Sequence, residues 1–457
     1  MIVMKFGGTS LESAAAIGRA AGIVAARRER QPVVVVSAMG KTTNQLLAMA
    51  SAAVAGRREE ALSALSALKN FHLDHARALA SREDADGLEQ AIKEHFQDLS
   101  ELAKGLSVLG ELTPRSVDAI SSYGERLSAR IVTAAFRKAE IDAVHVDSRR
   151  VLITDRRHTQ AAPLYEPTNE RLCAQVVPLV RSGQVVVMGG FIGSTEDGVT
   201  TTLGRGGSDF SASIVGAGIG AEEIQIWTDV DGMLTADPNT IPNAHRLKVL
   251  SFAEAAELAY FGAKVLHPST VLPAVERNIP VLILNSRRPE AAGTRVVRQA
   301  VPTTNPVKSI ACKKNITVVN IHSTRMLMAH GFLHRMFEVF DRYETAVDMV
   351  STSEVSVSAT IDNTARLEEI RHDLEKFAEV AVETDCAIIC LVGESIRDTP
   401  GVAARIFRAL EAINVVMISQ GGSQWNLSVV VSAKDLTAAV RLLHGEFFAE
   451  LDPAVFD

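Results

Sequence analysis

A lysine lies near the end of the first apolar run of the sequence, and a pair of glycines follows that run. The run IVMKF opens the chain, and Lys5 is followed by Gly7, Gly8 and Ser10. Glycines let backbone N–H groups approach phosphate oxygens, and the start of a following helix favours negative charge. A lysine adds a mobile positive charge that suits a phosphoryl group in transfer. This segment indicates a phosphate site, although glycine pairs after strands are often only turns.

A second glycine-rich turn has the sequence TTLGRGGSD at residues 201–209. Its three glycines surround Arg205, whose guanidinium can bind a carboxylate through two parallel hydrogen bonds. Ser208 and Asp209 are expected at the start of the next helix, where Asp209 could serve as an ordinary N-cap. Capping alone leaves Arg205 and the glycines unexplained, so the pattern favours an anion-binding turn.

Three further polar segments could belong to the same site. The turn WTDVDG at 227–232 suits a base and ribose, although a plain Asp-Gly turn would also explain it. Glu125, in GERLS, is predicted at a helix start, and FGAKVLHP contributes a second lysine, Lys264. Taken singly, Glu125 and Lys264 are most simply solvent-exposed, and His267 is most simply a hydrogen-bonded structural histidine.

Two near matches to nucleotide-binding motifs fail on context. Gly40-Lys41-Thr42 resembles the end of a Walker A loop, but Val35 occupies the position of the leading glycine. GAGIGA at 216–221 matches the dinucleotide pattern, but it follows a helical stretch and precedes a strand, the reverse of the required order. We interpret these glycines as the end of a helix.

The elements that must position these side chains alternate between strands and helices over the first 300 residues. Several apolar runs are continuous, as expected when helices cover both faces of a mostly parallel sheet. Residues 45–110 indicate helices inserted into this α/β unit, and a helix from Ser251 is predicted to end near His267 and Pro268. The predicted strands are 2–6, 32–39, 143–147, 184–191, 223–229 and 280–285.

The pattern changes after about residue 300, where VPTTNPV forms a proline-punctuated linker. Residues 315–385 follow the order strand, helix, two strands, helix, strand, which is a ferredoxin-like βαββαβ unit. A second copy occupies 386–457 with a period of about 75 residues, but it lacks its last strand. The spare strand at 307–314 could supply it, which predicts two interleaved copies.

Composition excludes several classes of protein. Apolar residues make up 47% and charged residues 22%, with a net charge of −7, which is typical of a soluble globular protein. Without a basic run, we expect neither a nucleic-acid partner nor a membrane partner, and no apolar run reaches the roughly 18 residues of a membrane span. We expect no signal peptide at the start MIVMKFGGTS, and we expect the four cysteines to form neither a disulfide framework nor a metal motif. We expect a cytoplasmic protein with reduced thiols and no protein-bound metal.

Seven motifs occur in one order across residues 5–268: KFGGTS, SAMGKTTN, SYGERLS, GGFIGS, TTLGRGGSD, WTDVDG with TADP, and FGAKVLHP. This ordered set resembles the aspartokinases. FLHRMFEVF and VDMVSTSEVSVS, at 332–358, resemble the first ACT domain of the lysine-sensitive class, often called aspartokinase III. The resemblance spans essentially the whole chain without an appended homoserine dehydrogenase or decarboxylase domain, which implies a monofunctional enzyme. It implies an α/β amino-acid-kinase fold over 1–300, followed by ACT domains at 315–385 and at 307–314 plus 386–457.

The implied reaction transfers the γ-phosphoryl of ATP to the side-chain carboxylate of L-aspartate, the first step of lysine, threonine and methionine biosynthesis. An ionised carboxylate needs no general base, so catalysis should consist of positioning and charge neutralisation. By resemblance, Lys5 stabilises the transferring phosphoryl group and Asp209 organises that lysine. Arg205 would clamp the α-carboxylate, while Glu125 would face the α-ammonium or orient Lys5.

The resemblance also implies the remaining substrate contacts. Magnesium is expected to enter with ATP, held mainly by phosphates and water. The residues carried over are Thr43 and Ser208 for aspartate, and Gly7, Gly8, Ser10, Thr228, Asp229, Asp237 and Lys264 for ATP.

The resemblance implies an effector site for L-lysine between the paired ACT domains of a homodimer. Two such dimers could pair into a tetramer. The carboxylates of Asp348 and Glu354 are suitable acceptors for the ammonium groups of lysine. Plain packing explains Met326 and Leu333 about equally well. The residues carried over are Met326, Ala329, Gly331, Phe332, Leu333, Val347, Asp348, Ser353 and Glu354.

Three positions depart from the pattern of the lysine-sensitive relatives. Leu234 replaces an aromatic residue near the nucleotide, Asn239 replaces an arginine, and Ala329 replaces a serine of the effector site. Two alternatives stay open: another amino-acid kinase, and a catalytically silent amino-acid sensor. The paired motifs TTLGRGGSD and GERLS weigh against the first, and the presence of Lys5 and Asp209 weighs against the second.

Overall fold

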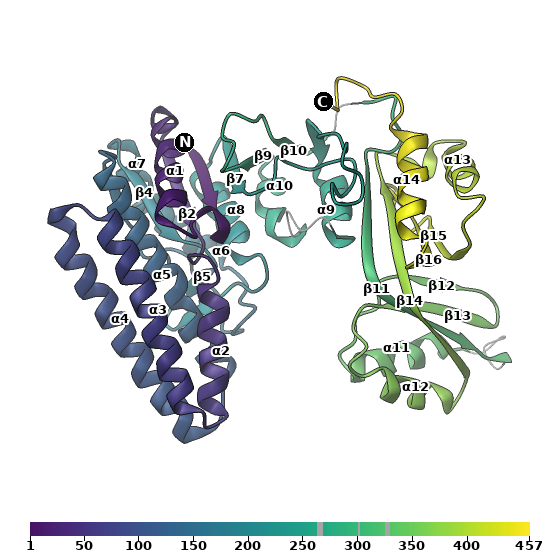
Figure 1. Ribbon diagram of the computed structural model, residues 1–457, viewed down its shortest axis with the longest axis horizontal. Coiled ribbons are helices and arrows are strands. Elements are labelled where there is room, and N and C mark those ends of the chain that lie inside the picture. Colours follow the sequence, from purple (N-terminus) through teal and green to yellow (C-terminus); the bar gives the residue numbers. More distant parts are fainter. Residues whose placement is uncertain (263–267, 300–301, 325–329) are drawn as a thin grey trace. The chain divides into compact units, whose positions relative to one another are not determined.

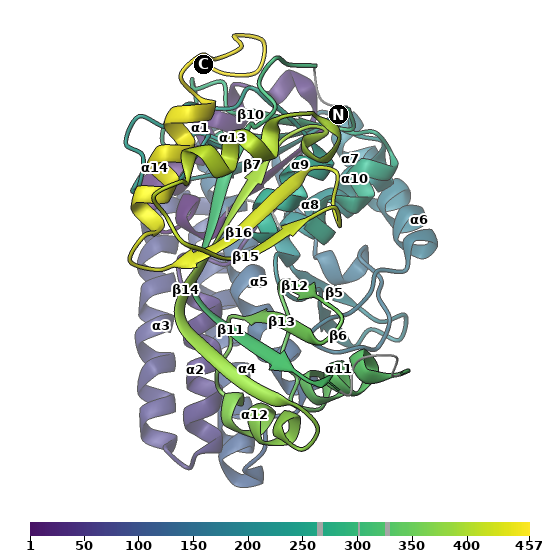
Figure 2. The same ribbon diagram turned by 90° about the vertical axis from the view of Figure 1, so that its right-hand side faces the viewer.

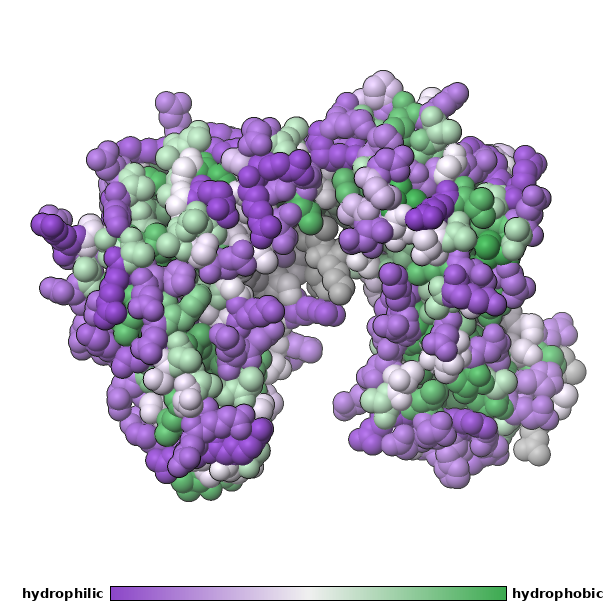
Figure 3. Space-filling model, viewed as in Figure 1, coloured by the Kyte–Doolittle hydropathy of each residue, from purple (hydrophilic) through white to green (hydrophobic). Residues whose placement is uncertain are grey.

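In the computed structural model, residues 1–262, 268–299, 302–324 and 330–457 are described (Figure 1). The chain forms two compact units, Met1–Met233 with Val265–Gln299, and Leu234–Lys264 with Ala300–Asp457. Hydrophilic residues predominate on the visible face of each unit, and scattered hydrophobic patches interrupt them (Figure 3). No described helix is long and apolar enough to cross a membrane.

The first unit is built on a mainly parallel sheet with the strand order β3-β4-β2-β1-β7-β9-β10. All its pairings are parallel except that of β10 with β9, which confirms the predicted sheet type. The helices α5 and α8 pack on its strands, so β1, β2 and β4 are buried along their whole length. The strands are β1 (Ile2–Phe6), β2 (Pro32–Val36), β3 (Ala143–His145), β4 (Val185–Gly189), β7 (Glu223–Thr228), β9 (Val281–Asn285) and β10 (Thr294–Val297).

Helices α2 (Thr42–Val54), α3 (Arg58–Leu79) and α4 (Arg82–Leu109) occupy the region predicted to be helical, and with α5 (Pro114–Lys138) they lie side by side (Figure 1). Leucine, isoleucine and alanine at helical spacing join one core with β1 and β2. Helix α8 (Gly207–Ile219) ends at Gly220 with φ 63°, which confirms the predicted helix end there, whereas Gly216 and Gly218 lie inside the helix. The other elements are α1 (Ala14–Ala25), α6 (Tyr165–Gln175), α7 (Val177–Arg181), α10 (Leu272–Glu276), β5 (Ile192–Ser194) and β6 (Thr200–Thr202).

The second unit contains a six-stranded antiparallel sheet with the order β12-β13-β11-β14-β16-β15 (Figure 2). Its two central strands, β11 (Ser309–His322) and β14 (Glu379–Val392), each run for 14 residues. The strands predicted at 307–314 and from residue 316 are therefore one strand, with a register shift between Lys313 and Ile316. The remaining strands of this sheet are β12 (Val350–Thr352), β13 (Ser356–Ile361), β15 (Val415–Gln420) and β16 (Asn426–Ser432). The unit also contains the short strand β8 (Val249–Ser251), and its helices include α11 (Phe332–Arg342), α12 (Leu367–Glu375), α13 (Val402–Ala409) and α14 (Leu436–Phe447).

Helix α9 (Phe252–Tyr260) also belongs to the second unit. Ser251 and Glu254 form a capping box at its start. The prediction that this helix ends near His267 is wrong, because the described helix ends at Tyr260. Gly262 follows with φ 127°, and a Cβ there would lie 2.4 Å from the carbonyl oxygen of Cys312. Close packing on β11 therefore ends the helix where the local sequence alone would continue it.

Candidate active site

An ion pair between β1 and α8 lies at the centre of the site. The Nζ atom of Lys5 is 2.6 Å from Oδ1 of Asp209, and their side chains are only 11% and 14% exposed. Asp209 lies in the first turn of α8, whose N-cap is Gly206 and has no side-chain cap. The structure therefore places Asp209 as the partner of Lys5 and not as an N-cap.

The turns after β1 and β2 touch each other through glycine. The N–H of Gly40 donates to the carbonyl of Gly8 over 3.2 Å, and a Cβ at Gly8 would lie 2.9 Å from the carbonyl oxygen of Gly40. The N–H of Gly7 donates to the carbonyl of Trp227 at the end of β7. Backbone groups from three adjacent strand ends thus converge beside Lys5, at the carboxyl edge of a parallel sheet where ligands commonly bind.

The turn that carries Arg205 has two left-handed residues, Gly204 at φ 77° and Gly206 at φ 70°. Glycine at Gly190 lets the start of α8 approach β4, because a Cβ there would lie 2.8 Å from the Cβ of Ser208. Arg205 itself is exposed and forms no ion pair with another described residue. Its guanidinium is available to an anionic ligand.

Glu125 is buried in the middle of α5, so the prediction of a helix start for this residue is wrong. One carboxylate oxygen accepts from the N–H of Ala38 over 3.2 Å, and Oε2 has no hydrogen-bond partner among the described residues. Burial raises the pKa of Glu125 to about 8, although the Ala38 N–H acts in the opposite direction. A buried carboxyl with a free oxygen is suited to a cationic ligand group.

These side chains line one cavity of about 460 Å³. It brings together Lys5, Gly8, Thr43, Glu125, Arg205, Ser208 and Asp209 of the predicted site. It also contains Ser37, Lys41, Asn44 and Phe191, which we did not assign to the site from the sequence. Ser37, Lys41 and Asn44 belong to the motif SAMGKTTN and Phe191 to GGFIGS, so these two motifs are the signal that could identify them. The failed Walker A match conceals Lys41.

The residues predicted for the nucleotide lie partly in each unit. In the first unit, the hydroxyl of Ser10 lies 2.7 Å from that of Ser286 and 3.3 Å from the carbonyl of Trp227, and Thr228 donates to Asp229 over 3.2 Å. Asp237 belongs to the second unit, where its Oδ1 accepts from the N–H of Asn239. Lys264 lies outside the described residues.

The predicted effector residues show a well-defined carboxylate. Asp348 has a side chain that is 4% exposed, and Nζ of Lys313 lies 2.6 Å from its Oδ1. The hydroxyl of Tyr260 donates to the same oxygen over 3.2 Å, whereas Oδ2 has no hydrogen-bond partner among the described residues.

The other predicted effector positions differ in exposure. Phe332 packs in the core beside Met336 and Val339, so its side chain is structural, while Leu333 is exposed. Gly331 is the left-handed N-cap of α11. Val347 is half-buried, and Ser353 and Glu354 are exposed. Met326 and Ala329 lie outside the described residues.

Comparison with known proteins identifies the family. The amino acid kinase family model matches residues 1–285, and an ACT domain model matches residues 389–447. Lysine-sensitive aspartokinase 3 of Escherichia coli is 35% identical, over 98% of this chain and 99% of its own length. Aspartokinase 2, chloroplastic, of Arabidopsis thaliana is 38% identical, over 99% of this chain and 85% of its own length.

Solved structures agree with this assignment. The crystal structure of E. coli aspartokinase III with aspartate and ADP, in the R-state, has a TM-score of 0.83 at 34% identity and covers 98% of this chain and all of its own. The T-state structure with lysine and aspartate has a TM-score of 0.84 at the same identity, covering 98% and 99%. The chain described here belongs to the aspartokinase family.

Proposed function

We propose that the cavity of the first unit binds L-aspartate and that Lys5 stabilises the phosphoryl group in transfer. As an aspartokinase, the protein moves the γ-phosphoryl of ATP to the side-chain carboxylate of aspartate, giving 4-phospho-L-aspartate and ADP. The observation that carries the proposal is the Lys5–Asp209 ion pair, because it lies in one cavity with Arg205 and the buried Glu125.

The chemistry needs charge neutralisation more than proton transfer. A carboxylate with a pKa of about 3.9 is already ionised at neutral pH, so no side chain must remove a proton. The barrier arises because two anions must approach each other, and a fixed ammonium group lowers it. Asp209 holds the Lys5 ammonium in place at 2.6 Å, so its position is set before the substrates bind.

Charge complementarity orients the aspartate. Arg205 binds the α-carboxylate through its guanidinium, and Glu125 receives the α-ammonium on its unpartnered oxygen. Thr43 and Ser208, which also line this cavity, supply hydroxyl groups. The side-chain carboxylate is then free to face Lys5.

For ATP, the backbone of Gly7, Gly8 and Ser10 offers a phosphate-binding turn, and Thr228 and Asp229 belong to the same unit. The family resemblance also assigns Asp237 and Lys264 to the nucleotide. The described residues contain no group of three or more His, Cys, Asp or Glu side chains that could hold a metal ion. Magnesium would enter with ATP, because Mg²⁺ commonly keeps several waters and binds substrate phosphates.

The second unit binds L-lysine, which inhibits the reaction, and pairs with a second copy of the chain. Asp348 is the acceptor for the effector's ammonium, since it is nearly buried and has an unpartnered oxygen. The strand β15 forms one edge of the antiparallel sheet and exposes Ile418, which supports an interface between copies at this edge.

Arg205→Ala tests the substrate assignment. Loss of a two-bond contact to the α-carboxylate should raise the KM for aspartate by at least tenfold, since hydrogen bonds to charged groups contribute about 1.5–3 kcal/mol. The KM for ATP should stay within about twofold, because Arg205→Ala removes a binding contact to aspartate alone. Steady-state ADP release, varied in each substrate, gives both constants. Equal effects on both substrates would contradict the assignment.

A further inference from the structure

A fully buried carboxylate lies outside the cavity and on the same helix as Glu125. Asp118 is 0% exposed and lies seven residues before Glu125, about 10 Å along α5. Its Oδ1 accepts from the hydroxyl of Thr202 over 2.5 Å, and its Oδ2 accepts from Nδ1 of His158 over 2.7 Å. The N–H of Thr159 lies 3.0 and 3.1 Å from the two oxygens.

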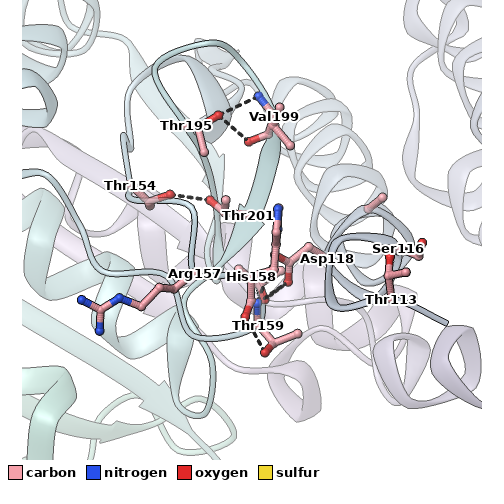
Figure 4. Close-up of polar contacts among 12 residues, drawn as sticks. Thr113, Ser116, Asp118, Thr154, Arg157, His158, Thr159, Thr195, Val199 and Thr201 are labelled. Carbon is pink, nitrogen blue, oxygen red and sulfur yellow. Dashed lines mark hydrogen bonds and ion pairs between the residues drawn. The ribbon is translucent and has the colours of Figure 1, made fainter.

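These contacts gather separate parts of the chain around one side chain. Figure 4 shows His158 and Thr159 beside Asp118. Asp118 is on α5, Thr202 ends the short strand β6, and His158 and Thr159 belong to the segment between β3 and α6. Thr159 is held at φ 69°, a conformation that β-branched residues rarely adopt. The buried carboxylate therefore fixes a strained turn as well as a strand end.

Both segments meet the turn that carries Arg205. Thr202 precedes Gly204 by two residues on the same strand and turn. A Cβ at Gly204 would lie 3.0 Å from the carbonyl oxygen of Thr159, so the strained turn packs directly against this glycine. Asp118 thus contacts the Arg205 turn by two routes, through the hydroxyl of Thr202 and through the backbone of Thr159.

We propose that Asp118 is a positioning residue for the aspartate site and sets the location of Arg205 through Thr202 and the 158–159 turn. Asp118 is not among the residues that line the cavity. The inference rests on the proposed role of Arg205 and deepens it. Small displacements of a binding group have large kinetic effects, so loosening this turn should weaken aspartate binding while the phosphate turn after β1 keeps its geometry.

Two matched substitutions at Thr202 and a control substitution at Thr154 test the proposal. Thr202→Val removes the hydroxyl that donates to Asp118 and keeps the shape of the side chain, whereas Thr202→Ser keeps the hydroxyl. Thr154→Val is the control, because Thr154 is also buried and its hydroxyl lies 2.7 Å from that of Thr201, the neighbour of Thr202 on β6 (Figure 4). Kinetic constants are measured for aspartate and ATP, and each variant's melting temperature is recorded.

Thr202→Val should raise the KM for aspartate about tenfold and leave the KM for ATP within about twofold. Thr202→Ser should restore most of the wild-type value, and Thr154→Val should leave both constants within about twofold. Asp118→Asn should exceed the effect of Thr202→Val, since the amide's NH₂ group would face donors. Thr202→Val changes one hydroxyl, so the test stays decisive where Asp118→Asn lowers the yield of folded protein.

A purely structural role predicts a different pattern. Equal rises in both KM values, or equal effects of Thr202→Val and Thr154→Val, would overturn the positioning role. Arg205→Ala separates this failure from a failure of the site assignment. If Arg205→Ala raises the KM for aspartate and Thr202→Val does not, only the role of Asp118 is refuted, whereas an unchanged KM in Arg205→Ala refutes the site assignment itself.

Discussion

At the scale of single residues, the site consists of four ionisable side chains that differ in how deeply they are buried. Lys5 and Asp209 form a nearly buried pair, Glu125 is fully buried, and Arg205 is exposed. The Lys5–Asp209 pair is therefore fixed before substrate arrives, and the exposed guanidinium of Arg205 is free to close on it. Each makes a separate prediction.

Lys5→Ala should reduce kcat by roughly 10²–10³-fold, the range found when one group that stabilises transition-state charge is removed. The fold should be kept, since Lys5 is one polar residue at the end of an otherwise apolar strand. Turnover is measured as ADP release, and circular dichroism monitors the fold. A folded variant with normal turnover would remove Lys5 from the mechanism.

Glu125 should make both stability and aspartate binding depend on pH. Its folded pKa of about 8 exceeds the ordinary value of 4.5, so the folded state retains a proton that the unfolded state has lost. Stability should then fall as pH rises from about 5 to 8, and Glu125→Gln should remove this slope. Denaturant unfolding across this range measures it.

The same proton affects the substrate. If Glu125 receives the α-ammonium, kcat/KM for aspartate should increase as pH approaches 8 and the carboxyl ionises. Glu125→Gln should lower kcat/KM and flatten this rise. A wild-type profile that falls between pH 6 and 8 would argue against contact with the ammonium.

At the scale of elements, the second unit contains a buried ion pair that joins α9 to the start of β11. Lys308 and Glu254 are both 0% exposed, and Nζ lies 2.8 Å from Oε1. Glu254 also accepts from the N–H and hydroxyl of Ser251. The pair thus fixes the capped start of α9 against the sheet of the same unit.

Lys308→Met should destabilise the protein by about 3–5 kcal/mol, because it leaves Glu254 buried without its cation. The double variant with Glu254→Leu should recover much of this loss, since neither charge then remains buried. Chemical denaturation measures the free energies of unfolding. A loss below about 1 kcal/mol for Lys308→Met would show that water or another group replaces the ammonium.

The sequence predicted the elements whose signal is local. Continuous β-branched runs predicted β1, β2, β4, β7 and β9, and helical spacing predicted α2 to α4. The end of α9 was not predictable, because it depends on Gly262 packing against Cys312, 50 residues later. The burial of Lys308 and the network of Asp118 also arise only from tertiary contacts.

The residues of the candidate site, like the elements of the fold, were predicted only in part from the sequence. The ordered motifs identified Lys5, Glu125, Arg205 and Asp209, which the fold brings to one cavity. Lys41 was missed because its motif was judged by a nucleotide pattern that it fails. The domain boundaries at 300, 315 and 386 stay predictions, as do the cytoplasmic location and the assembly into dimers.

At the scale of the whole molecule, regulation is expected to depend on the carboxylate of Asp348, which already forms an ion pair with Lys313 of the same chain. Lys313 reaches Asp348 at 2.6 Å and Asp362 at 2.8 Å, and Tyr260 at the end of α9 donates to Asp348. An effector ammonium at the unpartnered Oδ2 of Asp348 would therefore share this carboxylate with the ammonium of Lys313, whose like charge opposes it.

Lys313→Met should lower the L-lysine concentration needed for half-inhibition, by several-fold, because the competing cation is gone. Uninhibited kcat should change little. Lys434→Met, an exposed lysine on the loop after β16, is the control and should leave inhibition unchanged. Weaker inhibition in Lys313→Met would instead mean that Lys313 holds Asp348 in its binding position.

The most direct test of the account is acyl phosphate formation from L-aspartate and ATP with magnesium, trapped by hydroxylamine, with and without millimolar L-lysine. We predict aspartate-dependent product that L-lysine suppresses and that Lys5→Ala loses. Product that forms equally with and without L-lysine would support the kinase activity but refute the effector site at Asp348. No product with aspartate would contradict the central claim and favour a catalytically silent amino-acid sensor.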